Sequence, residues 1–277
     1  MPLNPDAVGV TTEPFTTKWG TKETMLYALG VGCGTADLKF TTENTRGVEL
    51  QVLPTMPVVL ARTDILLKAG ELDWTKIVHA QQSVVLHRPL PVKGTASNVA
   101  RISGIYDKGK AAILATETDG VDAETGERLW TTRMSLFIKG AGGWGGDSGP
   151  SSRIEFPETK PDDSLSLQTA ENQALIYRLS GDRNPLHADP SYAKAGGFER
   201  PILHGLCTYG FAGRALLALL AEGDPTRIRA ISARFAAPVL PGDLLTTDVW
   251  KHDDKTALFL VRAGDTVVLS DGLCELT

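Results

Sequence analysis

An internal duplication is the feature that most limits how this chain of 277 residues can fold. Landmarks of the first half recur in the second half, in the same order, at an offset of about 150 residues. The matched pairs are Tyr27 with Tyr177, Pro89 with Pro238, Gly94 with Gly242, and Asp107 with Asp254. Because both the order and the spacing are kept, the sequence indicates two copies of one domain.

We therefore expect an N-terminal domain over residues 1–138 and a C-terminal domain over residues 153–277. The segment 139–152 between them holds six glycines, three serines and a proline, and such a composition cannot pack as a helix or a central strand. A glycine-rich linker is the simplest interpretation. Trp144 at its centre would also suit a loop that is ordered against one of the halves.

Hydrophobic periodicity predicts an α+β fold. Apolar residues alternate over 129–138, and the segments 81–90 and 257–270 are also typical of strands. The segment 169–181 reads as a helix that Thr169 caps and Gly181 ends. A stripe at a spacing of three to four residues predicts a second helix over 202–222.

Glycines interrupt the apolar stripe of the second helix, at Gly210 and Gly213. Each costs roughly 1 kcal/mol relative to alanine inside a helix. Their presence therefore predicts that the helix backbone packs closely on a flat surface, such as a sheet.

Composition excludes several classes of protein. Hydrophobic residues make up 42% of the chain and charged residues 22%, which suits a globular core. The net charge of −5 disfavours nucleic-acid binding. The apolar run 215–221 is too short to cross a membrane, and the first residues do not resemble a signal peptide. Cys33, Cys207 and Cys274 are far apart, which argues against disulfides and favours a cytoplasmic location.

The segment from Tyr177 to Pro190 carries the clearest chemical signal. It places Asp182, Asn184 and His187 in one loop, and Asp and His form a natural acid–base pair near neutral pH. Asn184 and the proline after it stiffen the turn between the pair. The structural alternative is that these side chains only cap turns. A metal site is disfavoured, because no further cluster of metal ligands stands nearby in the sequence.

Gly205 stands at the start of the glycine-containing helix. Backbone N–H groups at a helix N-terminus have no partner in the helix and can stabilise negative charge on a carbonyl oxygen. A glycine there lets a ligand approach the backbone. The alternative is that Gly205 permits close packing and that His204 is an ordinary polar residue at a helix start.

The segments 181–190 and 197–211 closely resemble the hydratase 2 motif of the MaoC-like dehydratase family, which includes the (R)-specific 2-enoyl-CoA hydratases. The segments 78–94, 106–112 and 234–243 resemble their counterparts in two-domain members of the family. The resemblance implies a double hot dog fold, in which two tandem curled antiparallel sheets each wrap a helix.

The resemblance also implies roles for single residues. Asp182 and His187 fall on the catalytic pair, Asn184 on an Asn of the catalytic loop, and Gly205 on the glycine whose N–H binds the thioester oxygen. Four positions match substrate contacts: His79, Ala80, Lys108 and Phe235. The chain departs from the family at 79–82, where His-Ala-Gln-Gln replaces the frequent His-Gly-Glu-Gln.

The first half lacks this pair, because Gly32 and Asp37 stand where the second half has Asp182 and His187. We therefore expect the second half to catalyse and the first to form an acyl-chain pocket. Its segment 51–74 contains two prolines that would disturb a helix start. The residues expected to line the pocket are Met56, Val58 and Leu60, although they would equally suit the core.

The resemblance implies a hydro-lyase that converts trans-2-enoyl-CoA into (3R)-3-hydroxyacyl-CoA, reversibly, in fatty acid β-oxidation or in the metabolism of steroid side chains. It implies no metal, no cofactor, and a homodimer. One alternative is a 3-hydroxyacyl dehydratase acting on acyl carrier protein. A second alternative is a non-catalytic subunit that binds a thioester or a partner.

Overall fold

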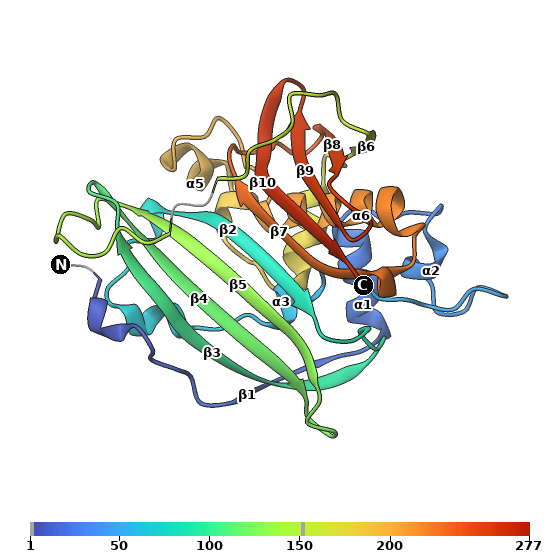
Figure 1. Cartoon of the computed structure of the whole chain (residues 1–277), viewed down its shortest axis with the longest axis horizontal. Helices are drawn as coiled ribbons and strands as arrows, with labels where there is room; N and C mark the ends of the chain where they lie inside the picture. The colour runs from blue at the N-terminus through green and yellow to red at the C-terminus, as the bar shows by residue number, and fades with distance from the viewer. Residues whose placement is uncertain (1–2, 151–152) are drawn as a thin grey trace.

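A computed structural model describes residues 3–150 and 153–277. The strands form one antiparallel sheet of ten, in the order β1-β3-β4-β5-β2-β7-β10-β9-β8-β6 (Figure 1). The first half supplies β1 (Phe15–Trp19), β2 (Ile77–Leu86), β3 (Gly94–Asp107), β4 (Ala111–Asp122) and β5 (Arg128–Lys139). The second half supplies β6 (Asp163–Gln168), β7 (Ile228–Phe235), β8 (Leu244–Lys251), β9 (Thr256–Ala263) and β10 (Thr266–Leu276).

The strand order confirms the duplication. Read inwards from either end, the sheet has the first, third, fourth, fifth and second strand of that half. The two halves meet where β2 pairs with β7, with Gln81 opposite Arg234 and Val84 opposite Ile231. A strand of the first half therefore lies directly beside a strand of the half that carries the Asp/His motif.

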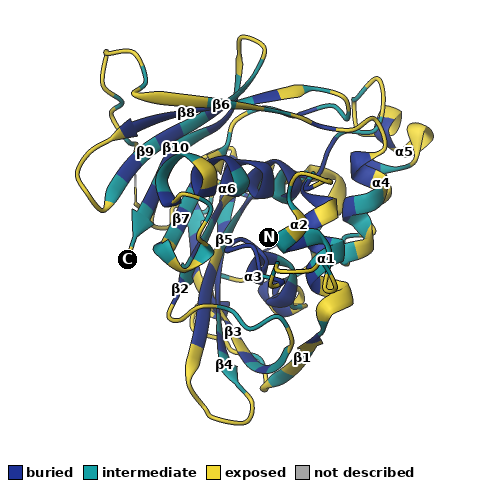
Figure 2. Cartoon of the chain, turned by 90° about the vertical axis from the view of Figure 1, so that its right-hand side faces the viewer, coloured by how far each residue is buried: buried dark blue, intermediate teal, exposed yellow. Residues whose placement is uncertain are grey.

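The helices of the described residues are α1 (Thr21–Gly30), α2 (Leu38–Thr41), α3 (Pro57–Leu60), α4 (Gln173–Tyr177), α5 (Pro190–Ala195) and α6 (Gly205–Ala221). Of these, α1, α3 and α6 pack against strands of the sheet. Short 3-10 turns lie at Pro5–Ala7, Ile65–Ala69, Trp74–Lys76, Arg178–Ser180, Pro185–His187 and Pro225–Arg227. Figure 2 shows α6 largely buried and enclosed by strands of the second half, and it contacts β6, β7, β8 and β10.

The counterpart of α6 in the first half is much shorter. The α-helix there is α3, which begins at Pro57, the position that proline favours at a helix start, and ends at Leu60. The expectation that the prolines disturb a helix start is therefore wrong for Pro57. Met56, Val58 and Leu60 are 1%, 6% and 6% exposed and belong to the main hydrophobic core. Their role as an acyl-chain wall stays a prediction.

The glycines of α6 face a different surface from the one expected. A Cβ on Gly210 would lie 2.3 Å from Cγ1 of Val31, and one on Gly213 would lie 2.5 Å from Cγ2 of Thr55. The expectation of a flat sheet is wrong here. The helix approaches loops of the first half, and the absence of a Cβ at these two glycines allows that close contact between the halves.

The predicted helix over 169–181 is also shorter. It consists of α4 and the following 3-10 turn, and Gly181 ends it with φ 122°. Thr169 does not cap it, because its hydroxyl donates to the Asp243 carbonyl oxygen at 2.7 Å.

The glycine-rich segment is ordered as far as it is described, up to residue 150. Asp107, at the end of β3, accepts hydrogen bonds from the N–H groups of Gly143 (2.9 Å) and Gly145 (2.8 Å). Trp144 packs against a hydrophobic cluster of the first half that includes Ile102, Leu114 and Ile138. The sequence alternative of a loop fixed against one half is the one observed. The domain boundaries themselves stay a prediction, and residues 151–152 of this segment lie outside the described ranges.

Two further observations concern membrane-spanning helices and the cysteines. Among the described residues, no helix is both long and apolar enough to span a membrane. Cys33, Cys207 and Cys274 are buried free thiols. Burial raises the pKa of the Cys33 thiol to about 12, so this group is not a reactive nucleophile.

Candidate active site

The loop after α4 is held rigid by its own side chains. The Asn184 side-chain oxygen accepts from the Leu186 N–H at 3.0 Å, and the Asp182 carboxylate accepts from the Asn184 N–H at 3.2 Å. These contacts form short turns that fix the chain direction into the 3-10 turn Pro185–His187. Asn184 is exposed and serves as the cap of that turn, so its catalytic role stays a prediction.

His187 is anchored through one ring nitrogen. The side chain is 9% exposed, and its Nδ1 lies 2.9 Å from the Ile202 carbonyl oxygen. A carbonyl oxygen can only accept, so Nδ1 carries the proton and Nε2 keeps its lone pair. That free nitrogen is what a general base requires.

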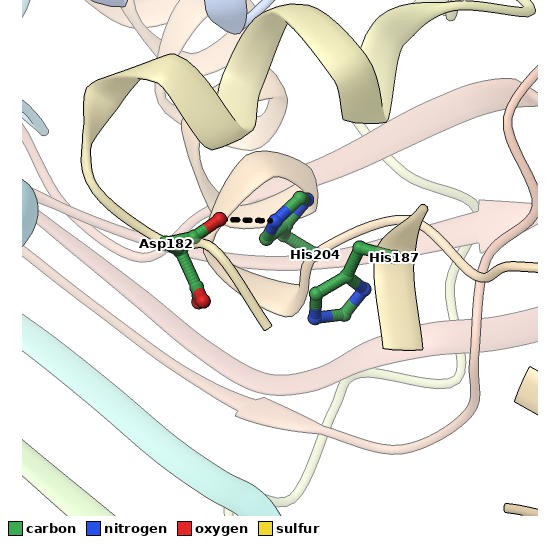
Figure 3. Close-up of side chains that lie close together, drawn as sticks. All are labelled: Asp182, His187 and His204. Atoms are coloured by element: carbon green, nitrogen blue, oxygen red, sulfur yellow. Dashed lines mark hydrogen bonds between the residues drawn. The ribbon is translucent and has the colours of Figure 1, made fainter. Parts of the chain in front are cut away.

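The structure adds a third residue that sequence reasoning missed. Ligand atoms of Asp182, His187 and His204 all lie within 4.8 Å of one another (Figure 3). The Nε2–H of His204 donates to the backbone carbonyl oxygen of Asp182 at 3.2 Å, and its ring stacks on that of His187 with centroids 3.7 Å apart. Its position directly before Gly205, inside the motif, was the available signal.

Gly205 begins α6 beside this cluster, with His204 as the N-cap. A Cβ on Gly205 would lie 3.0 Å from the Phe235 ring, at the end of β7. The Phe235 ring in turn lies against His79 of β2, with ring centroids 4.6 Å apart. The structure therefore brings together three predicted positions, His79 from the first half and Gly205 and Phe235 from the second half, at the start of α6.

Ala80 and Lys108 stand apart from these contacts. Ala80 lies in a β-bulge, where the pairing of β2 with β5 shifts between His79 and Gln81. Lys108 is exposed in the hairpin after β3, and its Nζ donates to the Ser148 carbonyl oxygen. Their substrate contacts stay predictions.

Burial keeps the imidazoles of this site neutral. It lowers the pKa of His187, against the opposing effects of the Ile202 hydrogen bond and the Asp182 charge. It also lowers the pKa of His79 to about 4, and the pKa of His204 to about 3.

The Asp182 carboxyl is held in its charged form. Burial alone would raise its pKa, but the Arg62 guanidinium and the Asn184 N–H lower it below its usual value. Arg62 comes from the first half, and its Nη1 would be 3.3 Å from a Cβ on Gly181. At neutral pH the site thus holds an ionised Asp182 and a neutral His187, both able to accept a proton.

The cluster of Asp182, His187 and His204 also bears on whether the site could hold a metal ion. No third ligand was expected near Asp182 and His187, yet His204 supplies one. Both histidines already use one ring nitrogen on a backbone carbonyl, which leaves one nitrogen on each. That no metal is needed here stays a prediction.

Fold and site together define a class: a double hot dog protein in which Asp182, His187 and His204 cluster at the N-terminus of a buried helix. Residues 154–271 match the family model described as MaoC like domain, and residues 18–140 match the MFE-2 hydratase 2 N-terminal domain.

Whole-chain relatives agree with these family models. The chain is 44% identical to 3-hydroxyacyl-thioester dehydratase Y of Mycobacterium tuberculosis over 99% of both chains. It is 39% identical to the peroxisomal enoyl-CoA hydratase 2 of Arabidopsis thaliana, over 83% of this chain and 81% of that one. The crystal structure of a MaoC-like dehydratase from Phytophthora capsici superposes with a TM-score of 0.90, at 30% identity over 99% of this chain and 98% of that one.

This chain belongs to the MaoC-like dehydratase and hydratase 2 family, and it is a hydro-lyase of the hydratase and dehydratase type. The predicted fold class is confirmed as an α+β double hot dog.

Proposed function

We propose that this enzyme hydrates trans-2-enoyl-CoA thioesters to (3R)-3-hydroxyacyl-CoA, and catalyses the reverse dehydration. The observation that carries the proposal is the clustering of Asp182, His187 and His204, whose ligand atoms lie within 4.8 Å of one another, with His204 directly before Gly205, the first residue of α6. The enoyl-CoA hydratase 2 name of the Arabidopsis thaliana relative supports the same substrate class.

The chemistry follows from the charges of these groups. The thioester carbonyl oxygen binds the Gly205 N–H at the positive end of α6, which stabilises the enolate-like charge that develops during addition. In the proposed reaction the attacking water binds between Asp182 and His187, and one of the two accepts its proton as the water oxygen bonds to C3. The proton is then delivered to C2 on the same face.

The low pKa values of both groups add a detail to this mechanism. Because Asp182 is ionised and His187 is neutral before reaction, neither brings a proton of its own. The proton that reaches C2 is therefore the one that the water gave up. Which residue accepts it is a property of the coupled pair.

Stereochemistry is the first test. We expect the 3-hydroxyacyl-CoA product to be the (R) enantiomer, as the family resemblance implies. Crotonyl-CoA hydration is followed by the loss of conjugated-thioester absorbance, and the product is then offered to an (S)-specific 3-hydroxyacyl-CoA dehydrogenase with NAD. No NADH is expected, whereas prompt NADH formation contradicts the proposal. An (S)-hydratase run in parallel is the positive control.

The pH dependence is the second test. The ordinary pKa of a histidine is near 6.5. Since burial lowers the pKa of His187, its imidazole gains a proton only at a pH below that value. We expect kcat/KM to be level from about pH 7 to 9 and to fall on the acid side with a midpoint below about 6.5. A rate that rises as the pH falls towards 5 would show that the protonated form is the active one.

The carrier of the acyl group is the main alternative. An acyl-carrier-protein thioester would favour a basic docking face, and the net charge of −5 gives none as a whole. Comparing kcat/KM for crotonyl-CoA, a bulky branched enoyl-CoA and crotonyl carrier protein decides between carriers and between fatty and steroid-like substrates.

The other predicted properties remain open to experiment. They are the cytoplasmic location, the homodimer, a role in β-oxidation, and the absence of nucleic-acid, membrane and cofactor partners. A purely non-catalytic subunit is disfavoured, because both members of the acid–base pair are present and share one site.

A further inference from the structure

His204 joins the three elements on which the proposed reaction depends. It lies 1% exposed between the Asp182 loop, the His187 turn and the first residue of α6. One face of its ring stacks on His187, at an interplanar angle of 28°, and the ring also lies near Tyr177, with centroids 5.0 Å apart. Its edge holds the Asp182 carbonyl oxygen (Figure 3).

The protonation state of His204 is set by these neighbours. Since a carbonyl oxygen accepts from Nε2, the proton is on Nε2, and Nδ1 is buried without a hydrogen-bond partner among the described residues. The charged and titratable groups around it are Asp182, His187 and Arg178, with Tyr177 against its ring. Burial of the ring and the positive charge of the nearby Arg178 both disfavour a charged imidazole, so the ring donates as a neutral group.

We propose that His204 is a positioning residue, which ties the Asp182 loop and the His187 ring to the N-terminus of α6. The inference rests on the function proposed above. Without this side chain, the Asp182 carbonyl oxygen loses its donor and the loop can move away from Gly205. The carboxylate and the thioester oxygen would then no longer be held at a fixed separation, which proton transfer requires.

Two substitutions separate the hydrogen bond from the packing of the ring. His204→Phe keeps an aromatic ring for stacking but removes the donor, and His204→Gln keeps an N–H donor near the position of Nε2. We expect His204→Phe to lower kcat about 10- to 100-fold with little change in KM, because the reacting groups are misplaced rather than lost. His204→Gln is expected to recover most of that loss.

The outcome separates positioning from mere packing. If the two variants lose kcat equally, or if His204→Phe keeps the wild-type kcat, the hydrogen bond does not position the site and the proposal is overturned. Thermal unfolding curves of both variants give the fraction of enzyme that is folded at the assay temperature. The measured kcat is divided by this fraction, so that a loss of folding is not counted as a loss of catalysis.

A second measurement does not depend on turnover. Imidazole ¹⁵N NMR of the wild-type protein is expected to show His204 as the neutral Nε2–H tautomer throughout about pH 6 to 8, and His187 as the neutral Nδ1–H tautomer at about pH 8. A His204 that titrates near its ordinary pKa, or that carries its proton on Nδ1, overturns the assignment. If the wild-type enzyme hydrated no enoyl thioester, the proposed function would fail, while this spectrum would still decide the role of His204.

Discussion

Replacing Asp182 with Asn, or His187 with Asn, is expected to lower kcat for the best enoyl thioester by about 10²- to 10⁴-fold without unfolding the protein. Each change removes one of the two groups that can accept a proton from water. The folded loop should survive Asp182→Asn, because the amide oxygen of the new side chain can still accept from the Asn184 N–H. In His187→Asn the new amide can likewise still donate towards the Ile202 carbonyl oxygen, the contact that His187 makes through Nδ1.

Matched controls lie within the same chain. Asp189→Asn is the same chemical change seven residues further along, at the N-cap of α5, where the side chain accepts from the Ser191 N–H at 2.8 Å. His252→Gln changes an exposed histidine at the end of β8. Both controls should keep the wild-type kcat. If either site variant unfolds at the wild-type temperature and still shows near-normal turnover, that residue is not a member of the catalytic pair.

The duplication and the catalytic loop could be predicted because their signals are local in sequence. Repeated landmarks revealed the two halves, and the strand order confirms them. Asp182, Asn184 and His187 stand within one stiff turn, so their proximity followed from the chain itself. Gly205 could be placed because the apolar periodicity located the start of its helix.

Contacts between distant segments could not be predicted in the same way. His204 meets Asp182 across 22 residues, and nothing in its local pattern fixes which way the ring turns. The partners of Gly210 and Gly213 come from the first half, since Val31 and Thr55 fill the space that a sheet was expected to fill. Arg62 reaches the Asp182 loop from the first half as well, with no motif to mark it.

The Gly205 N–H can be removed with little disturbance of the backbone, by Gly205→Pro. Gly205 is the first residue of α6, where proline is tolerated because the N–H there has no partner within the helix. His204 has φ −59° and ψ 134°, the extended conformation that a residue before proline prefers. The change therefore deletes one donor from the proposed oxyanion site and leaves the helix able to form.

Gly205→Ala is the matched control. Its Cβ meets the Phe235 ring at 3.0 Å, as the Cβ of proline does, so that ring must shift slightly in both variants. Alanine keeps the N–H, and the difference between the two variants isolates the donor. We expect kcat of Gly205→Pro to be about 10²- to 10³-fold below that of Gly205→Ala, the usual cost of losing one oxyanion donor. Equal kcat values in the two variants, both folded by circular dichroism, would mean that the thioester oxygen binds elsewhere and that Gly205 serves only the close packing of α6 against Phe235.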